Sequence, residues 1–277
     1  MPELPEVETI SKQLDKELSG FRLDDVVSST LKSYRPSFEK VRTLILGRKV
    51  IEVGRRSKLV LFKLSGGVFL AFHLKLTGQL LVRSLGFPED KFVRSIFFLS
   101  KGKTRVELRF SDVRKFGYVQ LIDGLPSLKQ LLAKYGPEPL DGLNKTLFSR
   151  IVLASKKPIK QLLLDQERIS GIGNIYANEA LWYAKIDPRA KSNELSQKSI
   201  SLLLTSLTKV LKLGIKYGGA SDNNYVQIHG EKGHFQDHFS VYGRKGEFCK
   251  RRDGGQIKRI PLGGRGTFFC DKCQLLR

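Results

Sequence analysis

The N-terminal stretch MPELPEVETI places a proline and a glutamate directly behind the first methionine. In one interpretation these residues simply start a helix, because proline suits the first helical turn and a carboxylate complements the helix dipole. In the other, removal of Met1 turns Pro2 into a secondary amine that is partly neutral near neutral pH. Such an amine can attack an electrophilic carbon and form an iminium, with Glu3 beside it as the acid. The N-terminus therefore has the groups needed for covalent catalysis.

The three cysteines of the chain all lie near its C-terminus, in CKRRDGGQIKRIPLGGRGTFFCDKC. Cys270 and Cys273 form a C-x-x-C pair, and Cys249 stands alone upstream. Tetrahedral zinc takes four ligands, and two turns of a hairpin usually supply two each. Asp253 is the best candidate for the fourth ligand, because it precedes GG in a turn, stands 17 residues before Cys270 and has a carboxylate that can bind zinc. Arg252 has the C-x-x-C spacing but cannot bind a metal. A hairpin without metal is the alternative.

His73 lies in the strand-like stretch AFHLKL and is a candidate general base. A single histidine in a strand is more often a packed or hydrogen-bonding residue, and that interpretation is favoured. The sequence contains no Ser/His/Asp triad, phosphate-binding P-loop or HExxH motif.

Charge gives the first indication of a partner. The chain has 49 Lys and Arg against 27 Asp and Glu, a formal charge of +22 and a pI near 10.0. An excess of this size favours a polyanion, most commonly nucleic acid, over a generally basic protein without such a partner. The basic residues of the cysteine-containing stretch contribute to this surface: Lys250, Arg251, Arg252, Lys258, Arg259 and Arg265.

The elements that position these groups follow from periodicity. Apolar residues recur at helical spacing from Leu4 to Leu18, which predicts an amphipathic helix over residues 3–18. Strand patterns then alternate with turns up to about residue 123, which is typical of an antiparallel sandwich or barrel. Helical patterns follow, and the last 40 residues or so return to short strands. Glycines in QERISGIGN suit a tight connection whose backbone N–H groups can face an anion.

These patterns predict an α+β multidomain protein. We expect an N-terminal catalytic domain over residues 1–125, a connection over 126–145, a helical domain with a loop over 146–239, and a hairpin over 240–277. No apolar run approaches the 18 or so residues of a membrane span, and the acidic N-terminus does not have the pattern of a signal peptide. We therefore expect a cytoplasmic, nucleoid-associated protein.

Several motifs in this order resemble the bacterial formamidopyrimidine-DNA glycosylases, which are related to the endonuclease VIII type. They cover essentially the whole chain: PELPEVET, RRSKLVLF, HLKLTG, SDVRKFG, GIGNIYANEAL, VYGRKGEFC and GGRGTFFCDKC. PELPEVE favours the formamidopyrimidine branch, because the other branch usually has glycine in place of Leu4.

This resemblance implies a fold with an N-terminal helix, a two-layered antiparallel β-sandwich, a helix-two-turn-helix domain and a zinc-finger-type β-hairpin, with DNA between the domains. It also implies removal of oxidised purines such as 8-oxoguanine and formamidopyrimidines. Pro2 attacks C1′ and displaces the base, and Glu3 protonates the sugar oxygen. The Schiff base then undergoes β- and δ-elimination. The catalytic set is Pro2, Glu3, Lys58 and Arg265.

The resemblance also assigns DNA-binding residues. Leu76, Arg114 and Phe116 fill the space left by the flipped nucleotide, with leucine where the family usually has methionine. Lys58, Asn174, Tyr242 and Arg265 contact phosphates. The full DNA-binding set comprises His73, Leu76, Arg114, Lys115, Phe116, Lys160, Asn174, Tyr176 and Tyr242. Lys160 is expected near the damaged base, and a capping loop is expected over residues 221–239.

The metal site departs from the family pattern. Family members usually have two C-x-x-C pairs, whereas here Asp253 replaces one cysteine, with one extra residue before it. The expected zinc ligands are Cys249, Asp253, Cys270 and Cys273. The expected partner is double-stranded DNA with oxidised bases or abasic sites, bound by a monomer. An enzyme acting on oxidised pyrimidines and a DNA-binding relative without activity are the alternatives.

Overall fold

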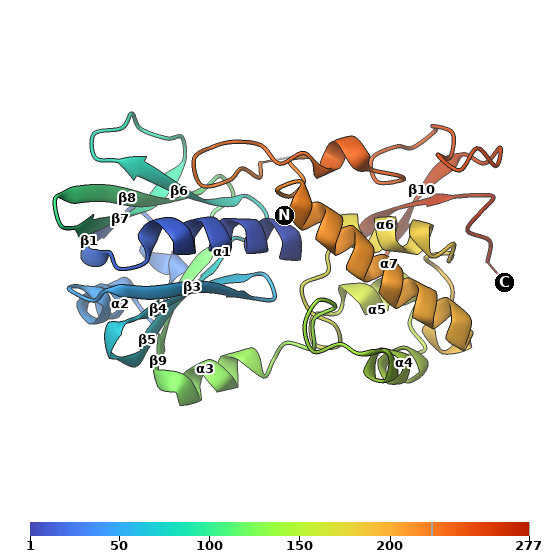
Figure 1. Cartoon of the computed structure of the whole chain (residues 1–277), viewed down its shortest axis with the longest axis horizontal. Coiled ribbons are helices and arrows are strands. Elements are labelled where there is room, and N and C mark those ends of the chain that lie inside the picture. Colours follow the sequence, from blue (N-terminus) through green and yellow to red (C-terminus); the bar gives the residue numbers. More distant parts are fainter. Residues whose placement is uncertain (223, 277) are drawn as a thin grey trace. The chain divides into compact units, whose positions relative to one another are not determined.

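The computed structural model describes residues 1–222 and 224–276, and the chain divides into two compact units. Unit 1 comprises residues 1–133 and 217–234, and unit 2 comprises residues 134–216 and 235–277. Figure 1 shows the elements of both units. The first boundary falls inside the predicted connection 126–145.

Unit 1 contains two β-sheets and the helix α1 (Leu4–Leu18). The four-stranded sheet has the order β1 (Arg22–Ser28), β7 (Val93–Lys101), β8 (Thr104–Asp112), β6 (Gly78–Ser84). The five-stranded sheet has the order β2 (Tyr34–Arg35), β9 (Tyr118–Asp123), β5 (Val68–His73), β4 (Leu59–Leu64), β3 (Val50–Arg56). All neighbouring strands are antiparallel except the short β2, which runs parallel to β9. One apolar core joins both sheets and α1, which confirms the two-layered sandwich.

The helix α1 forms where the apolar spacing predicts it. Val7, Ile10, Leu14 and Leu18 are at most 1% exposed and belong to the sandwich core. Each buried side chain of this size contributes about 1.5–3 kcal/mol, so this face of the helix holds its N-terminus firmly in unit 1. Helix α2 (Phe38–Ile45) and the 3₁₀ turns η1 (Leu31–Ser33) and η2 (Ser65–Gly67) complete the strand connections.

Helix α3 (Gly124–Leu132) occupies the start of the segment that the sequence predicts as a looser connection. Leu128 and Leu131 pack against Phe69, Ala71 and Ile122 of the five-stranded sheet. Tertiary packing of these leucines accounts for a helix in a stretch rich in glycine and proline.

Unit 2 consists of helices and one β-hairpin. The helices are α4 (Lys145–Leu153), α5 (Ile159–Leu164), α6 (Asn174–Tyr183) and α7 (Gln197–Lys216), with 3₁₀ turns η3 (Ser192–Glu194) and η4 (Phe235–His238). The hairpin pairs β10 (Ile257–Leu262) with β11 (Arg265–Cys270). Nearly all of α6 is buried, so it is the central helix of this unit. In the described part of the chain, none of the helices combines the length and the apolar character that crossing a membrane requires.

Residues 217–234 follow α7 but belong to unit 1. The backbone N–H of Val82 donates to the carbonyl oxygen of Ile228 at 2.8 Å, and the Ala220 N–H donates to Glu6 Oε1 at 2.8 Å. The expected capping loop, 221–239, is therefore divided: its larger part packs with unit 1 and its end with unit 2. Asn223, inside this loop, lies outside the described residues.

Candidate active site and DNA interface

The N-terminus is fixed by the start of α1. Glu3 is the N-cap, and it forms a reciprocal capping box with Glu6 in which the Glu3 backbone N–H donates to Glu6 Oε2 at 2.8 Å. Pro2 is buried and Glu3 is only 2% exposed, whereas Met1 is 37% exposed. The two predicted catalytic residues are thus held rigidly, with the methionine in front of them accessible.

Lys58 lies in the turn between β3 and β4, next to Ser57, which has a left-handed φ of 55°. An ion pair connects this turn to α1. Arg55 Nε lies 2.7 Å from Glu8 Oε2, and an Arg55 guanidinium N–H donates to the Ser57 carbonyl oxygen at 3.0 Å. Burial opposes ionisation of Glu8, but hydrogen bonds and charge from Arg55 and Lys12 hold its pKa below the usual value. This relay sets the position of Lys58 relative to the helix that carries Pro2 and Glu3.

His73 ends β5, and its role follows from its hydrogen bonding. The backbone N–H of Lys75 donates to His73 Nδ1 at 3.1 Å, so the neutral ring carries its proton on Nε2. Burial, together with the positive charges of Lys75, Lys58 and Arg35, lowers the pKa of His73 to about 3. The ring is therefore a neutral N–H donor at physiological pH. This supports the hydrogen-bonding interpretation over that of a general base.

The residues predicted to fill the space of the flipped nucleotide lie on two neighbouring turns. Leu76 belongs to the turn between β5 and β6, and Arg114, Lys115 and Phe116 belong to the exposed loop between β8 and β9. Phe116 is 53% exposed, and the Arg114 guanidinium carbon lies 4.8 Å from its ring centroid. An apolar ring backed by a cation is thus presented on the surface of unit 1.

Asp112 joins these two turns. Its carboxylate accepts a hydrogen bond from the Thr77 hydroxyl, one from the Arg114 backbone N–H at 3.2 Å and one from the Gly117 backbone N–H at 2.7 Å. Gly117 has no room for a side chain, since a Cβ there would lie 2.6 Å from the ring of Phe110. Sequence reasoning missed Asp112 and Thr77, although both lie inside the quoted motifs SDVRKFG and HLKLTG.

In unit 2, two predicted DNA-binding residues converge on the start of β11. Lys160 Nζ donates to the Gly266 carbonyl oxygen at 3.0 Å and to Thr267 Oγ1 at 2.7 Å, and Asn174 Nδ2 donates to the same carbonyl at 3.0 Å. The adjacent Arg265 is exposed. Lys160 and Asn174 therefore position the start of β11, which presents this guanidinium.

Lys160 and Tyr176 are buried inside unit 2, and their predicted part in DNA binding stays a prediction. Both are 0% exposed. The Lys160 ammonium is occupied inside the unit, and the Tyr176 ring stacks on Phe235 with centroids 5.1 Å apart. A motif match identifies the position of such residues, but not whether the side chain faces solvent.

The backbone position of Tyr242 depends on a buried carboxylate that sequence patterns did not identify. Glu179, on α6, is 1% exposed and accepts hydrogen bonds from the backbone N–H groups of Ser240, Val241 and Tyr242 at 2.8, 2.9 and 2.9 Å. Burial raises the pKa of Glu179, while these donors oppose that rise. Its occurrence inside GIGNIYANEAL, as the one charged residue of α6, was the available signal.

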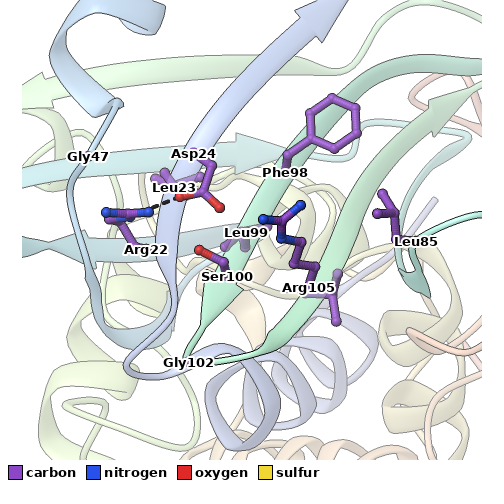
Figure 2. A pocket seen from close by; sticks show the side chains of 11 residues that line it. Arg22, Leu23, Asp24, Gly47, Leu85, Phe98, Leu99, Ser100, Gly102 and Arg105 are labelled. Atoms are coloured by element: carbon purple, nitrogen blue, oxygen red, sulfur yellow. Dashed lines mark hydrogen bonds and ion pairs between the residues drawn. The ribbon is translucent and has the colours of Figure 1, made fainter.

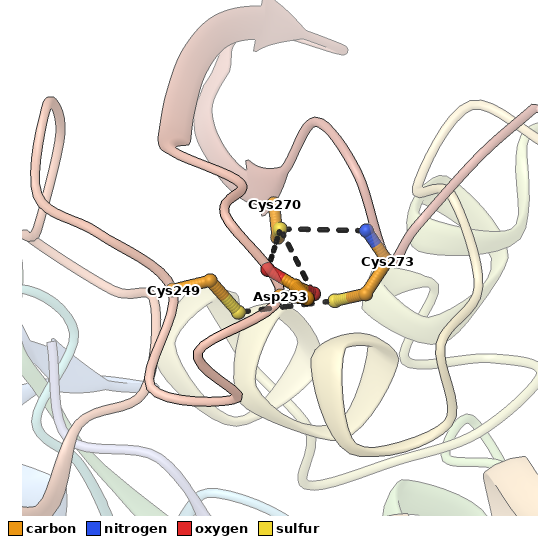
Figure 3. A group of neighbouring side chains, drawn as sticks. All are labelled: Cys249, Asp253, Cys270 and Cys273. Atoms are coloured by element: carbon orange, nitrogen blue, oxygen red, sulfur yellow. Dashed lines mark hydrogen bonds between the residues drawn. The ribbon is translucent and has the colours of Figure 1, made fainter.

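The four predicted metal ligands lie together at the base of the hairpin. One ligand atom from each of Cys249, Asp253, Cys270 and Cys273 lies within 4.8 Å of the others. Figure 3 shows these four side chains gathered together. The sulfurs of Cys249 and Cys273 are 3.9 Å apart, and Cys270 Sγ lies 3.9 Å from both Asp253 oxygens. The pKa of Asp253 is lowered, chiefly because its carboxylate accepts a hydrogen bond from the backbone N–H of Gly255. The carboxylate is therefore ionised and able to coordinate a cation. Three sulfurs and one carboxylate form a donor set that suits Zn²⁺.

A cavity of about 530 Å³ lies elsewhere on unit 1, against β1, β7 and β8. Figure 2 shows Arg22, paired with Asp24, and Arg105 along its wall. Its described lining does not include the residues predicted for catalysis or DNA binding, so it is not part of the candidate site.

The fold and the site together define a class, the DNA glycosylases with a helix-two-turn-helix domain. The family described as the formamidopyrimidine-DNA glycosylase N-terminal domain matches residues 1–119, and the corresponding H2TH domain matches residues 135–225. The chain belongs to the formamidopyrimidine-DNA glycosylase family.

Individual relatives agree over the full length. The chain is 41% identical to a formamidopyrimidine-DNA glycosylase of Chloroflexus aurantiacus, covering 99% of this chain and 98% of the relative. It is 36% identical to that of Lactococcus lactis subsp. cremoris, covering 99% of each. A solved structure of the complex between the Lactococcus lactis protein and DNA with an abasic site superimposes with a TM-score of 0.91 at 35% identity, covering 98% of this chain and 99% of that chain. A variant of the same protein with Fapy-dG DNA also gives 0.91.

Proposed function

We propose that this protein is a bifunctional base-excision repair enzyme, which removes oxidised purines such as 8-oxoguanine and formamidopyrimidines from duplex DNA and cleaves the abasic site by β,δ-elimination. The full-length similarity to formamidopyrimidine-DNA glycosylases, some of them solved with Fapy-dG or abasic DNA, supports the substrate class. The observation that carries the proposal is the buried Pro2–Glu3 pair held by the capping box of α1.

Pro2 acts as the nucleophile after removal of Met1. Its amine nitrogen attacks C1′ of the damaged nucleoside, and the bond from C1′ to the base breaks. The base leaves as the neutral molecule, with net transfer to it of the proton that the amine nitrogen loses. Glu3 gives a proton to the sugar ring oxygen as the ring opens, leaving an iminium between Pro2 and C1′. Elimination then breaks the C3′–O3′ bond and the C5′–O5′ bond in turn, and hydrolysis of the iminium restores the amine.

Neutral donors and cations from both units hold the DNA. Phosphates are bound by Lys58, His73, Asn174, Tyr242 and Arg265. These contacts fix the position of the protein on the duplex without reading the base sequence. Leu76, Arg114 and Phe116 fill the space of the flipped nucleotide, which offsets part of the unstacking cost of a few kcal/mol. Exposure of Phe116 and the link through Asp112 support this role. Lys115, also exposed, adds charge to the same loop.

Zn²⁺ is the proposed metal, held by Cys249, Asp253, Cys270 and Cys273. When bound, it stabilises the hairpin that carries Arg265, and it takes no part in the chemistry. A cytoplasmic, nucleoid-associated location belongs to the same proposal, because a charge of +22 favours association with chromosomal DNA.

Excision from a small panel of duplexes tests the function. The substrates contain one 8-oxoguanine, one formamidopyrimidine or one thymine glycol, and base release is followed under single-turnover conditions. The proposal expects the two purine lesions to be excised faster than thymine glycol. Preference for thymine glycol would assign the chain to the endonuclease VIII type of activity, and binding without excision would assign it a non-catalytic role.

A further inference from the structure

The chain's single tryptophan lies against the predicted metal site. Trp182, on α6, donates its indole N–H to Cys249 Sγ at 3.3 Å. Both side chains are buried, with 7% and 3% exposure. A buried N–H directed at a sulfur that is also a predicted metal ligand has a chemical consequence, because donors to ligating atoms tune the ligand and fix its orientation.

The two halves of the cluster receive their N–H donors differently. The C-x-x-C turn directs the backbone N–H groups of Lys272 and Cys273 at Cys270 Sγ, at 3.5 and 3.4 Å. In the upstream turn, the Arg252 N–H donates instead to the Cys249 carbonyl oxygen at 2.9 Å. Among the described residues, the N–H group that donates to the Cys249 sulfur comes from Trp182. The indole thus replaces a backbone donor that the altered upstream turn uses elsewhere.

The face of α6 that carries Trp182 makes further contacts with the hairpin along the length of the helix. Asn174, Asn178 and Trp182 are spaced by four residues and therefore lie on one side of the helix. Asn174 binds the Gly266 carbonyl at 3.0 Å, and Asn178 Oδ1 accepts the backbone N–H of Phe268 at 2.8 Å. Trp182 adds a third contact at the cluster, so α6 links the metal ligands to the start of β11, which presents Arg265.

Arg251 packs over the ring of the indole. Its guanidinium carbon lies 4.2 Å from the centroid of Trp182, and one guanidinium N–H donates to the Trp182 carbonyl oxygen at 2.8 Å. The ring is therefore packed by a cation that comes from the upstream turn itself. Arg251 therefore places a positive charge near the thiolates and also holds the indole in its orientation.

We propose that Trp182 is a positioning residue for the metal site: its indole N–H binds the metal-bound Cys249 thiolate, compensates for the altered upstream turn and couples metal binding to α6. This inference rests on the proposed metal site. Removing the donor leaves four ligands in place, but Cys249 then gives more electron density to the metal and is held less firmly.

The test replaces the N–H without removing the ring. Because the chain has one tryptophan, benzothienylalanine incorporated in place of tryptophan changes position 182 alone and exchanges the N–H for sulfur. Trp182→Phe is the second variant, and Tyr183→Phe is the matched control, since that ring lies 4.9 Å from Trp182. Zinc release to a colorimetric chelator is measured on the full chain, followed by the spectrum of the Co²⁺-substituted protein.

Both variants at position 182 are expected to release zinc about 10-fold faster than wild type, as is usual on loss of a donor to a metal ligand. Their thiolate-to-Co²⁺ charge-transfer band should move to longer wavelength, whereas Tyr183→Phe should behave like wild type. Wild-type release rates and an unshifted band in folded protein with benzothienylalanine would overturn the role of Trp182. Wild-type protein that binds neither Zn²⁺ nor Co²⁺ would overturn the metal site itself, and with it this inference.

Discussion

Arg55 Nε lies 2.7 Å from Glu8 Oε2, and this ion pair joins the helix that begins at the candidate nucleophile to the strand that leads to Lys58. This polar link therefore connects two sides of the candidate active site in unit 1. It is nearly buried on the arginine side, with 9% exposure of that side chain, so it is less screened than a surface pair.

Breaking this pair should impair catalysis more than folding. Arg55→Ala removes both the partner of Glu8 and the donor to the Ser57 carbonyl, so Lys58 loses its fixed position. We expect excision to slow by about 10-fold or more, because small displacements of catalytic groups are costly. Single-turnover rates compared with the melting temperature test this, and a full-rate variant would show that the link is dispensable.

The same pair predicts an acid dependence of stability. The pKa of Glu8 in the folded protein is below its usual value of 4.5, so folding favours the ionised form. Its contribution is present above pH 4.5 and is lost as the pH falls through the lowered pKa. Glu8→Gln should therefore reduce the pH dependence of unfolding in this acidic range. Denaturant titrations at several pH values give the free energy of unfolding of wild type and of Glu8→Gln as a function of pH. Parallel curves for the two proteins would contradict this prediction.

Asp112 should be needed for base flipping. Asp112→Ala leaves the Gly117 N–H and the Arg114 N–H without this acceptor, at about 1–3 kcal/mol for a buried group, and separates the turn of Leu76 from the loop of Phe116. We expect slow excision of 8-oxoguanine from duplex DNA and a much smaller effect on strand cleavage at a preformed abasic site. Equal losses on both substrates would show that Asp112 does not act through flipping.

His73 should bind DNA without titrating. Its pKa is lowered to about 3, so it stays neutral between pH 5 and 8, and the loss of affinity in His73→Ala should be the same factor across that range. The pH dependence of stability that His73 causes has the opposite sign to that of a histidine with a salt bridge. The folded state does not take up the proton that the unfolded state binds below about pH 6.5, so stability falls as the pH drops below that value. A binding defect that grows on acidification would indicate a charged His73.

Some of this organisation follows from sequence, and the rest depends on tertiary contacts. The helix at residues 3–18 and the cluster of Asp253 with three cysteines were predictable because spacing along the chain determines them. Partners such as Arg55 and Glu8 come from different elements, and nothing in the type of either residue identifies the other. The same holds for Glu179 and for Trp182, whose functions depend on loops more than 50 residues away.

Exposure is a second property that local pattern did not determine. Lys160 matched a DNA-binding position, yet its ammonium finds acceptors on Gly266 and Thr267 inside unit 2. Residues 217–234 follow a helix of unit 2, yet Tyr225 and Ile228 belong to the core of unit 1. A lysine or a polar loop is expected at the surface from composition alone, and only the packed structure shows otherwise.

Covalent trapping tests the central claim most directly. The protein is incubated with a duplex that contains one 8-oxoguanine, in the presence of sodium borohydride, and the adduct is digested and mapped by mass spectrometry. The account predicts a stable adduct on the N-terminal proline, formed only after removal of Met1 and abolished in Pro2→Gly without loss of DNA binding. Excision of the base with no adduct, or an adduct on a lysine such as Lys58, would contradict it.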